Sequence, residues 1–177
     1  HPLLLINGTA LNESGLQAAA RLKAAGIRVM TDTFYPKMRR GAGVFAPERM
    51  QYFAEGAMAD LEGSDLMILA GTSAPVAFFA YPGKPSLLVP DGCDVLDLGD
   101  ASSDSAATLT ALADALGASD AAAPAALRVP DLPTGALTAH SVGQSLARHM
   151  PDPAPVPDDG VPKGSMAYLP TQNPRPH

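Results

Sequence analysis

The sequence predicts an α/β fold, a doubly wound, Rossmann-like parallel sheet with helices on both faces. Two observations support this prediction. Short apolar runs alternate with helical patterns along residues 1–117. A strand, a helix and a second strand also fit within about 30 residues, which is the length of a right-handed βαβ crossover.

The first predicted unit occupies the beginning of the chain. Residues 3–6 are all apolar, as expected for a strand that is buried on both faces. A helix is expected from Glu13 to Ala25, with Asn12 as its N-cap and Gly26 as its terminator. Residues 27–31 then form the second predicted strand.

The later elements repeat this pattern. A helix is expected over residues 54–61 and a strand over residues 66–70, and the segments SLLVP and DVLDLG are two further strand candidates. The last helix of this part is expected to begin at a Ser103 or Asp104 cap and to end at Gly117. Its predicted apolar face comprises Leu109, Leu112, Ala113 and Leu116.

Proline usage divides the chain, because eleven of the 18 prolines follow Gly117. Residues 118–133 are rich in Ala, Pro and Asp, which is typical of an interdomain linker. Residues 134–177 begin with a helical pattern and then carry prolines too often for a long helix or a central strand. We therefore expect a domain at 1–117, a linker at 118–133 and the incomplete beginning of a second domain at 134–177.

Composition argues against several classes of protein. Twelve Lys and Arg against 18 Asp and Glu give a net charge of −6, and the basic residues are scattered, so no nucleic-acid surface is expected. No apolar run approaches the roughly 20 residues of a membrane-spanning helix, and no signal-peptide pattern is present. A soluble, cytoplasmic protein is expected. One cysteine, Cys93, and four dispersed His predict neither an intrachain disulfide nor a metal site.

Two turns are candidates for binding a nucleotide. Gly8 and Thr9 lie between the first strand and its helix, where backbone N–H groups can cradle an anion. Gly71, Thr72 and Ser73 follow another strand, and ligands of open parallel sheets bind at such strand ends. Neither turn has a Gly-x-Gly-x-x-Gly fingerprint or a P-loop Lys. The alternative interpretation is a pair of tight turns with close packing of helix against sheet.

Arginines and aromatic residues also gather in two segments. Residues 35–53 contain Arg39, Arg40 and Arg49 among aromatic rings, which indicates either a diphosphate or adenine contact or a loop packed against another domain. The segment APVAFFAYPGKPS is apolar, and we interpret it as an interface rather than a lid, because exposed Phe rings promote aggregation. His140 and His149 are expected on a solvated helix face, and we assign no residue of this chain a catalytic role.

The order of these features resembles a known family. The segments LLLINGTALNESGLQAAARLKAAGIRVMTDTF, RRGAGVFAPERMQYF and DLMILAGTSAPVAFFAYPGKPSLLVPDGCDVLDLG are similar to the central domain of thiamine-diphosphate-dependent enzymes of the acetolactate synthase and benzoylformate decarboxylase group. The resemblance is strongest to the acetolactate synthase large-subunit-like branch. The segment LTAHSVGQSLARHMPDPAPVPDDG resembles the start of the C-terminal, diphosphate-binding domain, with a first helix and then a first strand.

This resemblance implies where the chemistry of the family lies. Thiamine diphosphate and magnesium are held between a pyrimidine-binding and a diphosphate-binding domain, which would be partners of this chain in the parent enzyme. Active sites in the family form between two subunits, which implies a homo-oligomer. Asp158 and Asp159 follow the first strand of the partial domain, where they would approach the cofactor in a complete enzyme. The isolated chain is expected to be inactive.

The central domain of the family binds FAD in some members, ADP in others and no nucleotide in several decarboxylases. The segment SAPVAFFAYPG has no charged residue where the FAD-binding pattern has an Arg-Phe-Asp-Asp-like stretch, so weak or absent FAD binding is expected. The leading hypothesis is therefore part of a 2-keto-acid decarboxylase or carboligase. The alternative is a self-contained nucleotide-binding or protein-interaction module without catalysis.

Overall fold

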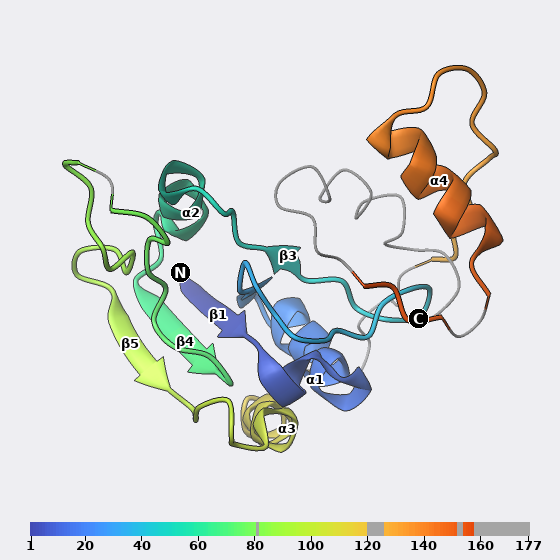
Figure 1. Ribbon diagram of the computed structural model, residues 1–177. Helices are drawn as coiled ribbons and strands as arrows, with labels where there is room; N and C mark the ends of the chain where they lie inside the picture. Colours follow the sequence, from blue (N-terminus) through green and yellow to red (C-terminus); the bar gives the residue numbers. More distant parts are fainter. Residues whose placement is uncertain (81, 120–125, 152–153, 158–177) are drawn as a thin grey trace. The chain divides into compact units, whose positions relative to one another are not determined.

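Five parallel strands form a single sheet in the order β3-β2-β1-β4-β5 (Figure 1). The computed structural model describes residues 1–80, 82–119, 126–151 and 154–157. The strands are β1 (Pro2–Ile6), β2 (Arg28–Thr31), β3 (Glu48–Arg49), β4 (Leu66–Ala70) and β5 (Asp94–Asp97). Because β1 lies at the centre and the chain moves from it first to β2 and later to β4, the sheet is doubly wound, as the sequence predicts.

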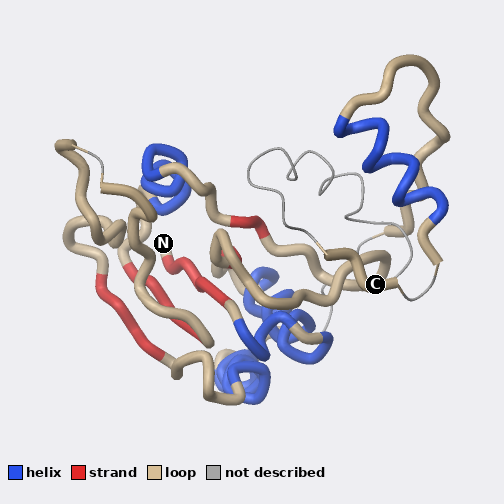
Figure 2. Tube along the Cα trace, in the orientation of Figure 1, coloured by secondary structure: helices blue, strands red, loops and turns tan. Residues whose placement is uncertain are grey.

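The helices are α1 (Glu13–Ala24), α2 (Ala54–Leu61), α3 (Ser105–Ala115) and α4 (Ala139–His149), and a short 3₁₀ turn, η1 (Gly8–Leu11), joins β1 to α1. Figure 2 shows the long loops that follow β2 and β4. The chain divides into two units, His1–Met38 with Pro47–Ala122, and Arg39–Ala46 with Ala123–His177. The sheet and the first three helices belong to the first unit, and α4 belongs to the second.

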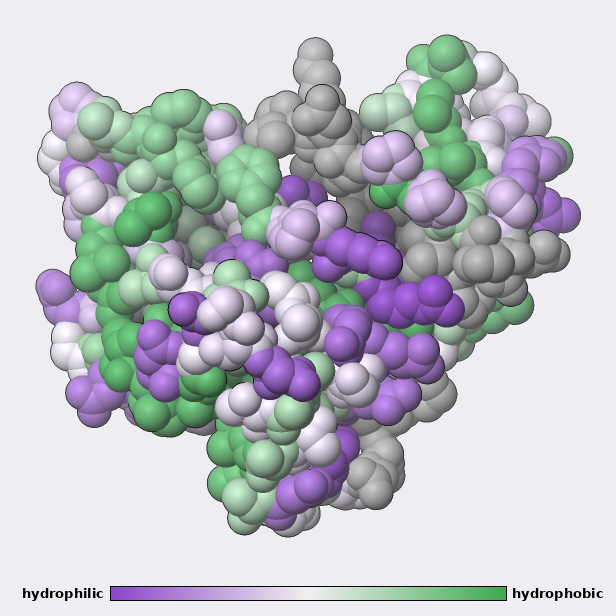
Figure 3. All heavy atoms as spheres, turned by 60° about the horizontal axis from the view of Figure 1, so that its bottom comes forward, coloured by the Kyte–Doolittle hydropathy of each residue, from purple (hydrophilic) through white to green (hydrophobic). Residues whose placement is uncertain are grey.

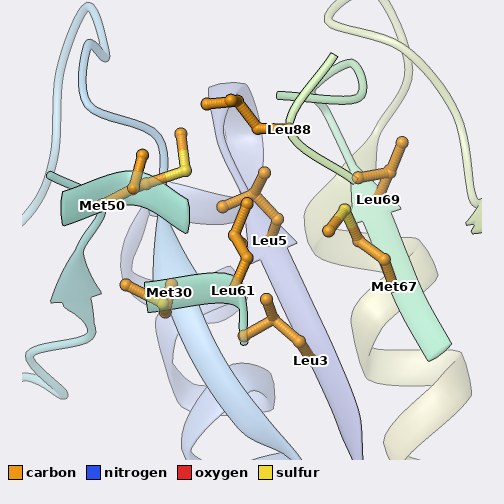
Figure 4. Close-up of a cluster of buried hydrophobic side chains, with 9 residues drawn as sticks. Leu3, Leu5, Met30, Met50, Leu61, Met67, Leu69 and Leu88 are labelled. Carbon is orange, nitrogen blue, oxygen red and sulfur yellow. The ribbon is translucent and has the colours of Figure 1, made fainter. Parts of the chain in front are cut away.

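The core explains why β1 is apolar at every position. Leu3, Leu4, Leu5 and Ile6 are completely buried, because successive side chains point to opposite faces and both faces are covered. One face packs on Ala57 and Leu61 of α2, and Figure 4 shows the resulting cluster. That cluster comprises Leu3, Leu5, Met30, Met50, Ala57, Leu61, Met67, Leu69 and Leu88. The packed helices α1 and α3 cover the opposite face.

Capping residues set the helix boundaries. The Asn12 side chain accepts the Gly15 N–H at 2.9 Å, and Asp104 accepts the Ala107 N–H at 3.1 Å, as the cap predictions require. A Cβ at Gly15 would overlap the carbonyl of Ala10, so this glycine lets η1 pack directly on α1. The predicted apolar face of α3 is partly wrong, because Leu116 is 55% exposed and the chain has already left the helix there.

One sequence prediction about strands is wrong, and one strand of the sheet was not predicted. The segment SLLVP is not a strand of the sheet. It folds back on the residues after β4, with an isolated antiparallel bridge between Val76 and Leu87. Pro85 precedes the segment and Pro90 is its last residue, and neither can donate a ladder hydrogen bond, while Leu88 still reaches the core. Strand β3 has only two residues, both polar, and the sequence pattern does not predict it.

In the second unit, α4 begins at a Thr138 capping box and carries exposed His140 and His149, as expected. The described residues of the predicted linker, 118–119 and 126–133, form neither helix nor strand. The described residues after α4, which are 151 and 154–157, contain no strand. Asp158 and Asp159 lie outside the described residues.

Candidate functional site

The ends of β1, β4 and β5 are connected by backbone hydrogen bonds. The Asn7 N–H donates to the Ala70 carbonyl at 3.0 Å, and the Gly71 N–H donates to the Gly99 carbonyl at 2.9 Å. The sequence-predicted turns at Gly8 and Gly71 therefore lie next to each other at the carboxyl edge of the sheet. In Figure 1, β1, β4 and β5 point toward this edge, near α3.

The conformation of Gly71 has a clear packing reason. Its φ is +70°, and an added Cβ would lie 2.5 Å from the Asn7 carbonyl oxygen and 2.7 Å from the Ser105 hydroxyl. Gly8 has a φ of +58°, and an added Cβ there would meet only ordinary contacts. Close packing of β4 against the turn after β1 thus accounts for Gly71 without any ligand.

Three side chains from adjacent strand ends meet at this edge, and we call them the strand-end triad: Asn7, Asp32 and Thr72. The Asn7 amide Nδ2 donates to Asp32 Oδ2 at 2.7 Å, and the Thr72 hydroxyl donates to the same oxygen. Asn7 Nδ2 also donates to the Phe34 carbonyl at 3.0 Å, which holds the chain that leaves β2 against the end of β1. Of these three residues, the sequence analysis singled out only Thr72.

The Asp32 carboxyl group is partly withdrawn from water. Burial raises its pKa above the ordinary value, and the hydrogen bonds from Thr72 and Asn7 oppose that shift. The signal that could have found Asp32 is its position directly after a buried strand at the carboxyl edge of a parallel sheet. Asn7 occupies the equivalent position after β1.

The other predicted residues have different surroundings. The Thr9 hydroxyl accepts the Ser105 N–H at 2.9 Å and donates to the Ser103 carbonyl at 3.3 Å, so it connects η1 to the start of α3. Ser73 is exposed. The structure therefore brings Gly8, Gly71 and Thr72 together, while Thr9 has a structural contact with α3.

Aromatic residues form a second feature of the first unit. Tyr52 lies between four rings, with centroids 5.7 Å from Phe34, 5.1 Å from Phe53, 5.5 Å from Phe78 and 5.5 Å from Phe79. These five residues are the aromatic cluster. Its four Phe residues are each 44–50% exposed. Figure 3 shows hydrophobic and hydrophilic residues mixed over the surface that faces the viewer.

The arginines identified in the sequence have separate roles. The Arg49 guanidinium lies over the Tyr35 ring at 5.4 Å, and its Nε donates to the Thr33 carbonyl at 2.7 Å, so Arg49 fastens β3 to the loop after β2. Arg39, Arg40 and Phe45 belong to the second unit.

The described ranges contain no group of three or more His, Cys, Asp or Glu side chains arranged to hold a metal ion. In the same ranges, no helix has the length and apolar character needed to cross a membrane. The two His residues of α4, His140 and His149, belong to the second unit.

No protein-family model matches this chain. A curated protein of Mycobacterium tuberculosis (strain ATCC 25618 / H37Rv), named "Putative acetolactate synthase large subunit IlvX", is 45% identical to the chain over 158 residues. These residues are 89% of this chain and 30% of that protein, so the chain spans less than a third of its relative.

The fold has a counterpart among solved structures. The X-ray structure of "a putative thiamin diphosphate-dependent enzyme isolated from Mycobacterium smegmatis" matches 98% of this chain and 37% of that chain, with a TM-score of 0.59 and 22% sequence identity. This likeness concerns the fold, and it agrees with the parallel sheet described above.

Proposed function

We propose that this chain is part of an acetolactate synthase large-subunit-like protein and that it supplies the central domain of a thiamine-diphosphate-dependent enzyme. The observation that carries the proposal is the 45% identity over 89% of the chain. The proposed reaction of the parent enzyme is decarboxylation of a 2-keto acid, with or without ligation of the product to a second carbonyl. The parent is thus a lyase or a transferase.

The described residues do not fit thiamine diphosphate and magnesium. Magnesium prefers oxygen ligands from carboxylates and phosphates, and no cluster of three His, Cys, Asp or Glu exists in the described ranges. The open acceptor of the strand-end triad is a carboxylate, which repels a diphosphate. We therefore assign the cofactor to the pyrimidine-binding and diphosphate-binding domains of the parent and derive no step through it here.

We assign a structural role to residues 1–117 in the parent enzyme, with residues 118–133 as linker and 134–177 as the start of the next domain. The aromatic cluster supports this role. Four half-exposed Phe rings around one Tyr are more apolar surface than a solvated loop requires, and such patches mark protein interfaces. We propose that Phe53, Phe78 and Phe79 of this cluster pack against another domain or subunit of a cytoplasmic homo-oligomer.

A second candidate function is a self-contained nucleotide-binding module. The strand-end triad favours it, because open parallel sheets bind ligands outside the carboxyl ends of their strands. Any binding of FAD or ADP would then map to the turns at Gly8, Thr9, Gly71, Thr72 and Ser73, and it would be weak, because the Asp32 carboxylate repels a diphosphate.

The proposal is tested by expressing the full protein to which this sequence belongs and measuring carbon dioxide release from pyruvate and benzoylformate. Turnover that requires both thiamine diphosphate and magnesium is the expected result. Absence of turnover on both keto acids, in a folded protein that binds the cofactor, would exclude a decarboxylase of these substrates. Nucleotide binding without any affinity for thiamine diphosphate would favour the second candidate.

A further inference from the structure

The backbone N–H groups at the carboxyl edge are already used within the fold. The Gly8 N–H donates to Asn7 Oδ1 at 2.8 Å, the Ala10 N–H to the Asn7 carbonyl at 3.2 Å and the Gly71 N–H to the Gly99 carbonyl at 2.9 Å. A phosphate held by these turns would have to replace those bonds, because anion sites at helix starts depend on free N–H groups. These three amides are not free to hold a diphosphate.

The side chains offer an acceptor instead. Both donors of the Asn7 amide are occupied, by Asp32 Oδ2 and by the Phe34 carbonyl, and the Thr72 hydroxyl also donates to Asp32 Oδ2. The bonds from Asn7 and Thr72 to Asp32 both end at Oδ2, so Asp32 Oδ1 has no bonded partner in the part of the chain that the structure describes. Asp32 forms no ion pair with a described residue either. An ionised carboxylate can accept up to about four hydrogen bonds, so acceptor capacity remains.

An aromatic surface begins close to this carboxylate. Phe34 is two residues beyond Asp32, and its carbonyl is held by the same Asn7 amide. Its ring is 46% exposed and contacts Phe78 edge-on, with the ring centroids 5.1 Å apart. The first unit therefore offers a hydroxyl acceptor and an exposed aromatic ring on one short stretch of chain.

We propose that Asp32 makes the carboxyl edge of the sheet a site for the ribose of an uncharged nucleoside and excludes ligands that carry a diphosphate. The ribose hydroxyls donate to Asp32 Oδ1, which is the role of an acidic residue after the second strand in dinucleotide-binding sheets. The base contacts the exposed Phe34 ring. The negative charge of Asp32, without a cation to compensate it, repels phosphate groups at the same edge. This inference rests on the first unit alone and holds whether or not the parent is a thiamine-diphosphate enzyme.

The test is a titration of the full 177-residue chain with adenosine and with ADP, followed by amide chemical shifts. Adenosine is expected to move the Asn7, Asp32 and Thr72 amides and to bind at least tenfold more tightly than ADP. Tighter binding of ADP than of adenosine, or no binding of adenosine at millimolar concentration, overturns the proposal.

Asp32→Asn removes the charge. The amide oxygen takes the place of Oδ2 and accepts from Asn7 and Thr72, so the amide NH2 stands at the Oδ1 position and donates to a ribose hydroxyl oxygen instead of accepting from it. The variant is expected to bind adenosine with an affinity within a few-fold of that of the unmodified chain, and to bind ADP more tightly than the unmodified chain does. The ratio of the adenosine affinity to the ADP affinity therefore falls toward one. Asp91→Asn, at an exposed aspartate far along the chain, is the matched control and should leave the ratio unchanged. An unchanged ratio in Asp32→Asn contradicts the proposal. If that variant does not fold, the ratio measured on the unmodified chain decides.

Discussion

At the scale of single residues, two glycines with the same backbone conformation differ in what surrounds them. Gly71 and Gly63 have φ values of +70° and +77°, but an added Cβ meets the Asn7 carbonyl and the Ser105 hydroxyl only at Gly71. At Gly63 nothing lies within 4 Å. Left-handed backbone costs a non-glycine residue about 1–2 kcal/mol, and overlap adds to this.

We therefore predict that Gly71→Ala lowers the free energy of unfolding by clearly more than Gly63→Ala, which should cost about 1–2 kcal/mol. Urea unfolding of both variants, followed by circular dichroism, measures the difference. Equal losses would mean that the turn after β4 does not approach Asn7 as closely as described.

Asp32 provides a prediction about pH. Burial raises the pKa of this carboxyl in the folded chain above its unfolded value, so the folded state binds the proton more tightly. The ionised group therefore destabilises the fold above its folded pKa, and the penalty disappears as the pH falls below the unfolded value. The Asp32→Asn variant should have a higher free energy of unfolding than the unmodified chain near about pH 7. This difference in free energy should shrink toward about pH 4.

The measurement is urea unfolding of both proteins across that pH range, with Asp91→Asn as the exposed control. A gap that stays constant with pH would show that the Asp32 carboxyl is not withdrawn from water. A difference in the free energy of unfolding that widens on acidification would mean that the fold lowers the pKa of Asp32 instead of raising it.

At the scale of elements, much of the fold was predictable. β4 and α2 have the predicted bounds, and α1 and α3 begin where their capping residues indicate. Apolar runs and capping residues are local signals, so they can be recognised without tertiary information. β3 and the segment SLLVP were not predictable, because pairing with β2 or with the chain after β4 decides their structure.

The same limit applies to the candidate site. The glycine turns were recognisable from the sequence, since turns have local signatures. The contacts of Asp32 with Asn7 and Thr72 join residues separated by 25 and 40 positions, and only the order of strands in the sheet brings them together. The sequence analysis therefore found the turns and missed the carboxylate that gives the edge its charge.

The N-terminus of α3 carries a prediction at this scale. Asp104 accepts the Ala107 N–H, and loss of such a cap costs about 0.5–2 kcal/mol. Asp104→Ala should lower the free energy of unfolding by about 1 kcal/mol. Asp91→Ala, which removes an exposed aspartate outside any helix, should change it by less than about 0.5 kcal/mol. Equal effects of the two substitutions in urea unfolding would contradict the assigned cap.

At the scale of the whole molecule, the arrangement of structured and unstructured segments predicts where proteases act. Arg128 is exposed in a described segment without helix or strand, whereas Arg28 and Arg49 belong to paired strands. Limited digestion with trypsin, followed by mass spectrometry, should show early cleavage after Arg128 and late cleavage after Arg28 and Arg49. Cleavage at Arg28 or Arg49 as fast as at Arg128 would count against the proposed sheet.

We propose that this chain is a supporting domain of a thiamine-diphosphate enzyme and that it does not itself hold the cofactor. Isothermal titration calorimetry of the 177-residue chain with thiamine diphosphate and magnesium tests it most directly. The cofactor needs a magnesium ion held by oxygen ligands, and no such cluster exists in the described ranges, so no saturable heat is expected. Saturable binding of thiamine diphosphate that depends on magnesium would contradict the account, because it would place the diphosphate site within this chain.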